Sequence, residues 1–199
     1  MSEQYLPAKK LYSIFKFIMQ PQDQIQVLKA IAAIIAFVAM ITDMKKGRIY
    51  NWLTFPAIFI GWGLNSFFFG LSGFAYSFAA TIAGIAIYLV PAAIGLIGMG
   101  DVKLMAALGA LGGTKFVFSI FLYTSALGIP HALLVQFLNY GRNAIPMLAA
   151  SISTRAFLDK TIQKENANLA ENKKFRFLLG LDIFIATLIA IKFTIDFKI

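Results

Sequence analysis

Residues 49–100 read IYNWLTFPAIFIGWGLNSFFFGLSGFAYSFAATIAGIAIYLVPAAIGLIGMG, and none of their side chains is charged. A membrane-spanning helix needs about 20 consecutive apolar residues, so this stretch is long enough for two spans and a turn. The turn is predicted at Gly70-Leu71-Ser72-Gly73, where two glycines flank a short polar break. The spans are therefore expected near residues 52–70 and 74–97.

The whole chain has the composition of an integral membrane protein. Its 199 residues are 59% hydrophobic and 14% charged, with a mean hydropathy of +0.76, whereas soluble domains are about 45–50% apolar and about 25% charged. The absence of cysteine excludes disulfide frameworks, thiol catalysis and cysteine-ligated zinc, and the single histidine, His131, argues against a histidine metal cluster. We therefore expect neither a metal nor a cofactor.

The net charge of +9 is also typical of a membrane protein. In a membrane protein, Lys and Arg accumulate in cytoplasmic loops and at anionic lipid headgroups, so we expect lipid partners and no nucleic acid. With the amino end outside, the inner loops carry more Lys and Arg than the outer segments. This predicts a multi-pass protein of the cytoplasmic membrane with its amino end out.

Four further apolar segments complete a predicted all-α membrane bundle of about six transmembrane helices. Spans are expected at residues 25–43, at residues 116–141 with a bend at Pro130, and at residues 177–193. Residues 102–113 are expected to form a shorter helix buried among the others, because its alanines and glycines allow close helix packing.

The amino-terminal residues 1–24 are expected to form an interfacial amphipathic helix. Its apolar residues recur at helical spacing with lysines between them, and they are Leu11, Ile14, Phe15 and Ile18. Residues 25–199 then form one membrane-embedded domain. Its longest polar stretch, at about residues 139–176, is predicted to be a cytoplasmic loop.

Three acidic residues, Asp43, Asp101 and Asp182, lie in or at the ends of the predicted spans. Because an ionisable group at membrane depth is costly, each is a candidate for function. Asp43 lies 14 residues after Lys29, and Asp101 lies 14 residues before Lys115. If both lysines mark the outer interface, each carboxylate lies about 21 Å below it. In a hydrocarbon core about 30 Å thick, both would be recessed by about 9 Å from the cytoplasmic edge.

Two carboxylates at one depth can act as a general acid and a general base. One Asp can take a proton from water while the other, protonated, donates to a peptide carbonyl. Two glycines, Gly98 and Gly100, precede Asp101 and would let a substrate backbone approach. A purely structural role stays open, with Asp43 paired to a neighbouring lysine and Asp101 capping a helix.

Residues 98–113, GMGDVKLMAALGALGG, and residues 43–56, DMKKGRIYNWLTFP, resemble the type IV prepilin peptidase and archaeal preflagellin peptidase family of GxGD membrane aspartyl proteases. The resemblance covers about residues 25–140. It implies that Asp43 and Asp101 are the catalytic aspartates. It also implies cleavage of the short basic leader of prepilin-like precursors at the cytoplasmic face.

Gly98, Gly100, Asn51 and Lys103 are the candidate site-shaping or substrate-binding residues. The resemblance places the family's glycines on Gly98 and Gly100, while Lys103 either orients a carboxylate or substrate or extends to the headgroups. The chain departs from the family where many members have Ile-Pro-Asn, since it reads Ile49-Tyr50-Asn51. Without cysteine it also resembles a short, protease-only form that lacks a Cys-rich domain.

Asp182 and His131 are expected to have structural roles. Asp182 is interpreted as paired with Lys103 or a bound water, or as lying in a wet crevice near the cytosolic end of the last span, and His131 is expected to form a hydrogen bond within the bundle. The same aspartates could instead serve a non-enzymatic membrane subunit or a small ion- or proton-coupled transporter. A presenilin-like protease ranks lower, because it would be expected to carry Tyr before the first acid, where this chain has Thr42.

Overall fold

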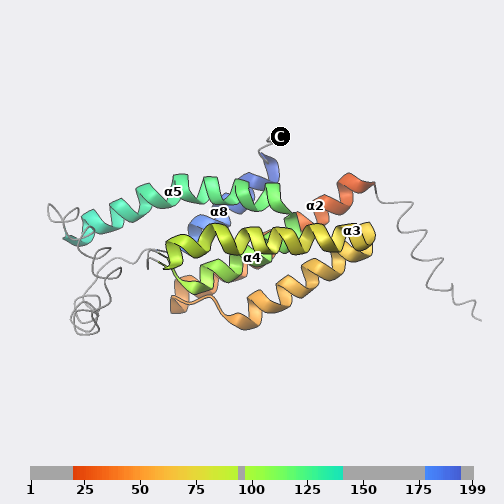
Figure 1. The fold of residues 1–199 in the computed structure, drawn as a ribbon. Helices are drawn as coiled ribbons and strands as arrows, with labels where there is room; N and C mark the ends of the chain where they lie inside the picture. Colours follow the sequence, from red (N-terminus) through yellow and green to blue (C-terminus); the bar gives the residue numbers. More distant parts are fainter. Residues whose placement is uncertain (1–19, 94–96, 141–177, 194–199) are drawn as a thin grey trace, which may run out of the picture.

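The computed structural model describes residues 20–93, 97–140 and 178–193, and every regular element in these residues is a helix. The helices are α2 (Pro21–Lys46), α3 (Asn51–Ala93), α4 (Met99–Gly112), α5 (Thr114–Tyr140) and α8 (Leu179–Lys192). Figure 1 shows them side by side in an elongated bundle. The predicted all-α class is confirmed.

Helix α3 is a hairpin of two arms. The arms meet at Gly70, whose φ of 69° and ψ of −153° are not helical and are readily adopted only by glycine. The arms run in opposite directions (Figure 1), and Trp62 Nε1 of the first donates to Thr81 Oγ1 of the second at 3.0 Å. The chain therefore turns where the paired glycines predicted.

Helix α4 is short and mostly buried against α3. Nine of its 14 residues are buried, and a Cβ added to Gly61 of α3 would lie 2.8 Å from the Cβ of Ala110. The Ala110 carbonyl, in the last turn of α4, accepts hydrogen bonds from Ser77 Oγ at 2.5 Å and Asn65 Nδ2 at 2.9 Å. Small residues thus bring α4 close to α3, and polar side chains satisfy a carbonyl at its end.

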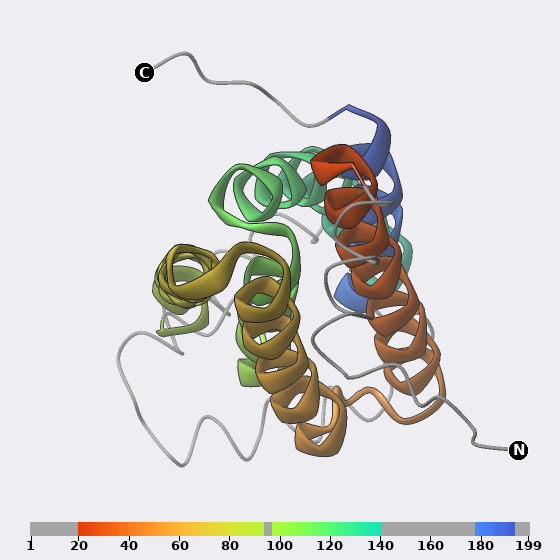
Figure 2. The ribbon, with the colours of Figure 1, turned by 90° about the vertical axis from the view of Figure 1, so that its right-hand side faces the viewer.

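The remaining helices cover the other side of α4. Helix α8 packs on both α2 and α5, while α4 contacts α2, α3 and α5. In Figure 2, α2, α5 and α8 lie together on one side of the bundle, and the two arms of α3 lie on the other. Helix α4 therefore connects the two halves of the described bundle.

The expectation of six transmembrane helices is not supported. In the described part of the chain, three helices are long and apolar enough to cross a membrane, namely α2, α3 and residues Thr114–Val135 of α5. Helices α4 and α8 have 14 residues each, which is about 21 Å of helix against a hydrocarbon core of about 30 Å. An apolar stretch of sequence can form either a membrane-spanning helix or a short helix packed between longer ones. Its hydrophobicity alone does not distinguish the two.

Two predicted segments fall largely outside the described residues. Of the interfacial helix expected over residues 1–24, residues 1–19 are not described, and α2 begins at Pro21, earlier than expected. Of the loop expected at about residues 139–176, residues 139 and 140 end α5, and the rest is not described. The described helices nevertheless make the protein a helical membrane protein.

Candidate active site

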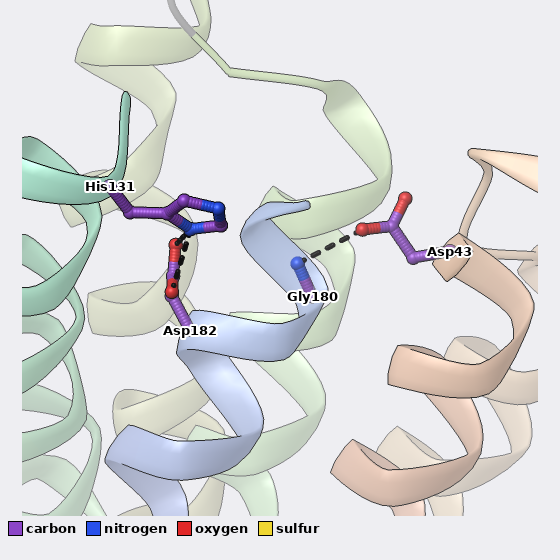
Figure 3. A network of polar contacts seen from close by, with 4 residues as sticks. All are labelled: Asp43, His131, Gly180 and Asp182. Atoms are coloured by element: carbon purple, nitrogen blue, oxygen red, sulfur yellow. Dashed lines mark hydrogen bonds and ion pairs between the residues drawn. The ribbon is translucent and has the colours of Figure 1, made fainter. Parts of the chain in front are cut away.

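Asp43 lies in the last turn of α2. The helix ends at Gly47, whose φ of 61° is left-handed and whose N–H donates to the Asp43 backbone carbonyl at 2.7 Å. The half-buried Asp43 carboxylate points away from its own helix toward α8 (Figure 3), where its Oδ2 accepts a hydrogen bond from the Gly180 N–H at 3.1 Å. The hydrogen bond that the structure gives this carboxylate is therefore to the first turn of α8, not to a neighbouring lysine.

Asp101 lies in the first turn of α4. Its Oδ2 accepts a hydrogen bond from the N–H of Gly98, the residue that caps the helix, at 3.2 Å. The helix-capping role that the sequence left open is thus present, and it also holds the Asp101 carboxylate at the end of the buried helix.

The two aspartates come from packed helices and lie on either side of one close contact. Helix α2 contacts α4, and Gly100, next to Asp101, lies against Ile49 in the loop that follows Asp43. At the other end of the bundle, Lys29 Nζ lies 5.5 Å from the ring centroid of Phe116, which follows Lys115. The depth comparison between Asp43 and Asp101 stays a prediction.

The glycines before Asp101 serve local packing. A Cβ on Gly100 would lie 3.1 Å from the Cβ of Ile49, in the connection between α2 and α3, and one on Gly98 would lie 3.2 Å from Asp101 Oδ2. Gly100 thus lets the start of α4 lie against the loop that follows Asp43. The backbone that approaches Gly100 in this structure belongs to the protein itself, whereas the sequence-based expectation was a substrate.

Lys103 and Asn51, both predicted to shape the site, contact each other. Lys103 Nζ donates to Asn51 Oδ1 at 2.8 Å and lies 5.6 Å from the ring centroid of Phe55. This contact connects the first turns of α4 and α3. Lys103 therefore binds a neutral side chain in this structure, and the pairing with Asp182 that the sequence suggested is wrong.

Asp182 instead pairs with His131. His131 Nδ1 of α5 lies 2.9 Å and 3.1 Å from the two carboxylate oxygens of Asp182 in α8 (Figure 3). Asp182 is 4% exposed. The prediction that His131 bonds within the bundle is confirmed, but its partner was missed. The sequence did contain a signal for this pair. His131 and Asp182 are isolated ionisable residues in two different apolar segments, and each needs a partner at membrane depth.

Gly180 is the residue near the aspartates that sequence reasoning missed altogether. It contacts Asp43 through its backbone N–H, a group that almost every residue carries, so the sequence does not show which N–H meets the carboxylate. Among the described residues, no three His, Asp or Glu side chains are grouped so that they could hold a metal ion.

A protein-family model matches the part of the chain that contains both aspartates. The model of the type IV leader peptidase family matches residues 30–133, more than half of the chain. The chain belongs to the type IV leader peptidase family. The matched segment of this leader peptidase includes Asp43 and Asp101, whereas α8 lies beyond it. No curated protein and no solved structure matches the chain.

Proposed function

We propose that this protein is a membrane-embedded aspartic endopeptidase in which Asp43 and Asp101 form the acid/base pair. The observation that carries the proposal is that Asp43, in the last turn of α2, and Asp101, in the first turn of α4, lie on two packed helices. Gly100, next to Asp101, lies against Ile49 in the loop that follows Asp43. Membership of the type IV leader peptidase family favours this chemistry over an ion carrier. The proposed substrates are prepilin-like or preflagellin-like precursors with a short basic leader.

In the proposed reaction the two carboxyl groups share one proton. The ionised Asp takes a proton from water, the resulting hydroxide attacks the scissile carbonyl carbon, and the protonated Asp donates its proton to the carbonyl oxygen. When the tetrahedral intermediate collapses, the C–N bond breaks and the first Asp gives its proton to the leaving amine. The second Asp takes a proton back from a hydroxyl of the intermediate, which becomes the new carboxyl group, so the pair again holds one proton. No covalent enzyme intermediate forms in this scheme.

The backbone donors near the pair suit this chemistry. Asp43 accepts from Gly180 N–H and Asp101 accepts from Gly98 N–H, so each carboxylate is oriented by a fixed helix end. Such donors stabilise negative charge without reorganising during the reaction. In the proposal, Lys103 and Asn51 hold the start of α4 against α3 and thereby keep Asp101 in place.

Cleavage by the purified protein tests the proposal directly. The protein in detergent micelles, incubated with a prepilin-like precursor, is expected to release the leader at one site. The rate is expected to be the same with and without EDTA, because water and two carboxyl groups suffice. Cleaved and uncleaved precursor are separated by mass spectrometry. No cleavage, or EDTA inhibition that one specific metal reverses, would contradict the proposal.

The proposed orientation places Asp43 near the cytoplasmic face. Lys46 ends α2 beside it, and Ser72 follows the turn at Gly70, at the far end of the first arm of α3. This chain has no native cysteine, so single cysteines at these positions can be labelled selectively. In intact cells, Lys46→Cys is expected to react only with a membrane-permeant maleimide, and Ser72→Cys also with an impermeant one. The reverse pattern would refute the orientation.

A further inference from the structure

We propose that Gly180, His131 and Asp182 are positioning residues for Asp43. In this proposal the His131–Asp182 pair holds the first turn of α8 in place, and the Gly180 N–H of that turn orients the Asp43 carboxylate (Figure 3). The inference rests on the proposed peptidase function of Asp43. It adds α8, which lies outside the matched family segment, to the catalytic unit.

The need for such an orienting group follows from the place of Asp43 in its helix. The last turn of a helix carries unpaired carbonyls and the negative end of the dipole, so a carboxylate there is unfavourable. The first turn of α8 offers the opposite environment, because its N–H groups have no partner within the helix. The Gly180 N–H meets Asp43 Oδ2 at 3.1 Å, so α8 compensates for the unfavourable end of α2.

The absence of a side chain at Gly180 is what permits this contact. A Cβ there would lie 2.9 Å from Asp43 Oδ2 and 3.0 Å from the Asp43 Cβ. Gly180 is buried. Any larger residue would therefore push the Asp43 side chain away from the amide.

The His131–Asp182 pair acts on the same turn from the other side. Asp182 follows Gly180 by two residues in the first turn of α8, and both of its carboxylate oxygens lie within 3.1 Å of His131 Nδ1 on α5. A buried carboxylate is costly unless it is paired, so this contact fixes the rotation of α8 about its axis. Helices α2 and α5 thus hold one turn of α8 between them, and moving that turn would displace the Gly180 N–H from Asp43.

Steady-state kinetics of leader cleavage test the proposal. His131→Ala and Asp182→Ala are each expected to lower kcat about 10-fold to 100-fold, the effect of a displacement of about 1 Å at a reacting group, with KM nearly unchanged. The double variant is expected to be no slower than the slower single variant, because the two residues act as one unit. His131→Asn, whose side-chain amide nitrogen can reach the position of Nδ1, is expected to restore most of kcat.

A matched control separates positioning from a general weakening of α8. Thr187 is buried in the same helix, and its Oγ1 donates within the helix to the Ile183 carbonyl at 2.7 Å. Thr187→Val is therefore expected to keep kcat and KM at the wild-type values. Unchanged kcat in both alanine variants, or a kcat loss in Thr187→Val equal to theirs, would overturn the inference.

The amide resonance of Gly180 gives a measurement that does not depend on activity. In glycine-15N-labelled protein in micelles, this resonance is identified by its loss in Gly180→Ala. It is expected to shift in Asp43→Asn and to lose protection from solvent exchange in Asp182→Ala. An amide that responds to neither variant overturns the positioning. If the amide responds while the wild-type protein cleaves no precursor, the contact with Asp43 stands and the peptidase function is what fails.

Discussion

Asp43→Asn and Asp101→Asn are each expected to lower the rate of leader cleavage by at least about 100-fold, the lower range of what general acid–base catalysis contributes. Asparagine keeps the shape of the side chain but can neither take a proton from water nor donate an acidic proton. Its carbonyl oxygen can still accept the hydrogen bonds that Gly180 N–H and Gly98 N–H now give to the carboxylates. Both variants are therefore expected to fold, and precursor cleavage followed by mass spectrometry measures the loss.

Asp23→Asn is the matched control for this experiment. Asp23 lies in the first turn of α2, at the opposite end of the helix that carries Asp43. The same chemical change there is expected to leave cleavage at the wild-type rate. Wild-type activity in either Asp43→Asn or Asp101→Asn would sink the proposed mechanism, provided the unfolding temperatures show that the variants are folded.

Gly61→Ala is expected to destabilise the bundle by about 1–3 kcal/mol, the usual cost of forcing an extra carbon into a packed interior. The added Cβ would lie 2.8 Å from the backbone carbonyl carbon of Ala110 and 2.9 Å from its oxygen. Backbone atoms cannot move aside as a flexible side chain can, so α4 itself must shift. Because Asp101 lies at the start of α4, cleavage activity is expected to fall along with the unfolding temperature.

Gly63→Ala supplies the comparison, two residues further along the same arm of α3. No atom lies within 4 Å of a Cβ added there, and Gly63 is exposed. Replacing a helical glycine with alanine is expected to stabilise the helix by up to about 1 kcal/mol. Thermal unfolding in micelles can be followed by the fluorescence of Trp52 and Trp62. Equal effects of the two substitutions would show that α4 does not require the glycine contact.

Much of the helix arrangement could be predicted because hydrophobic length and glycine placement are local properties. The break at Gly70 follows from a backbone conformation that glycine adopts readily. The burial of α4 follows from its small side chains, which make close packing possible. The number of membrane-spanning helices could not be predicted from such local properties, because a 14-residue apolar helix can either approach the membrane surface or end inside the bundle.

In the candidate site, too, the sequence predicted individual residues, whereas the structure was needed to show their contacts. The cost of an acid within or next to an apolar helix made Asp43, Asp101 and Asp182 candidates, and the family resemblance of the neighbouring residues then selected Asp43 and Asp101. The contact between Lys103 and Asn51 could be anticipated only as two residues near one site, without their hydrogen bond. The sequence left the partner of Asp182 open among Lys103, a bound water and a wet crevice, and the packing of α5 on α8 selects His131 instead.

By itself, the sequence determined that this chain enters a membrane and where its hairpin turns. These properties depend on transfer free energies and backbone preferences of nearby residues. Only the tertiary structure decided that the Gly180 N–H faces Asp43 and that His131 holds the same turn of α8. Such contacts join helices that are far apart in the sequence, and a backbone N–H has the same chemistry in almost every residue. Their selection therefore depends on how the helices pack, which no local pattern encodes.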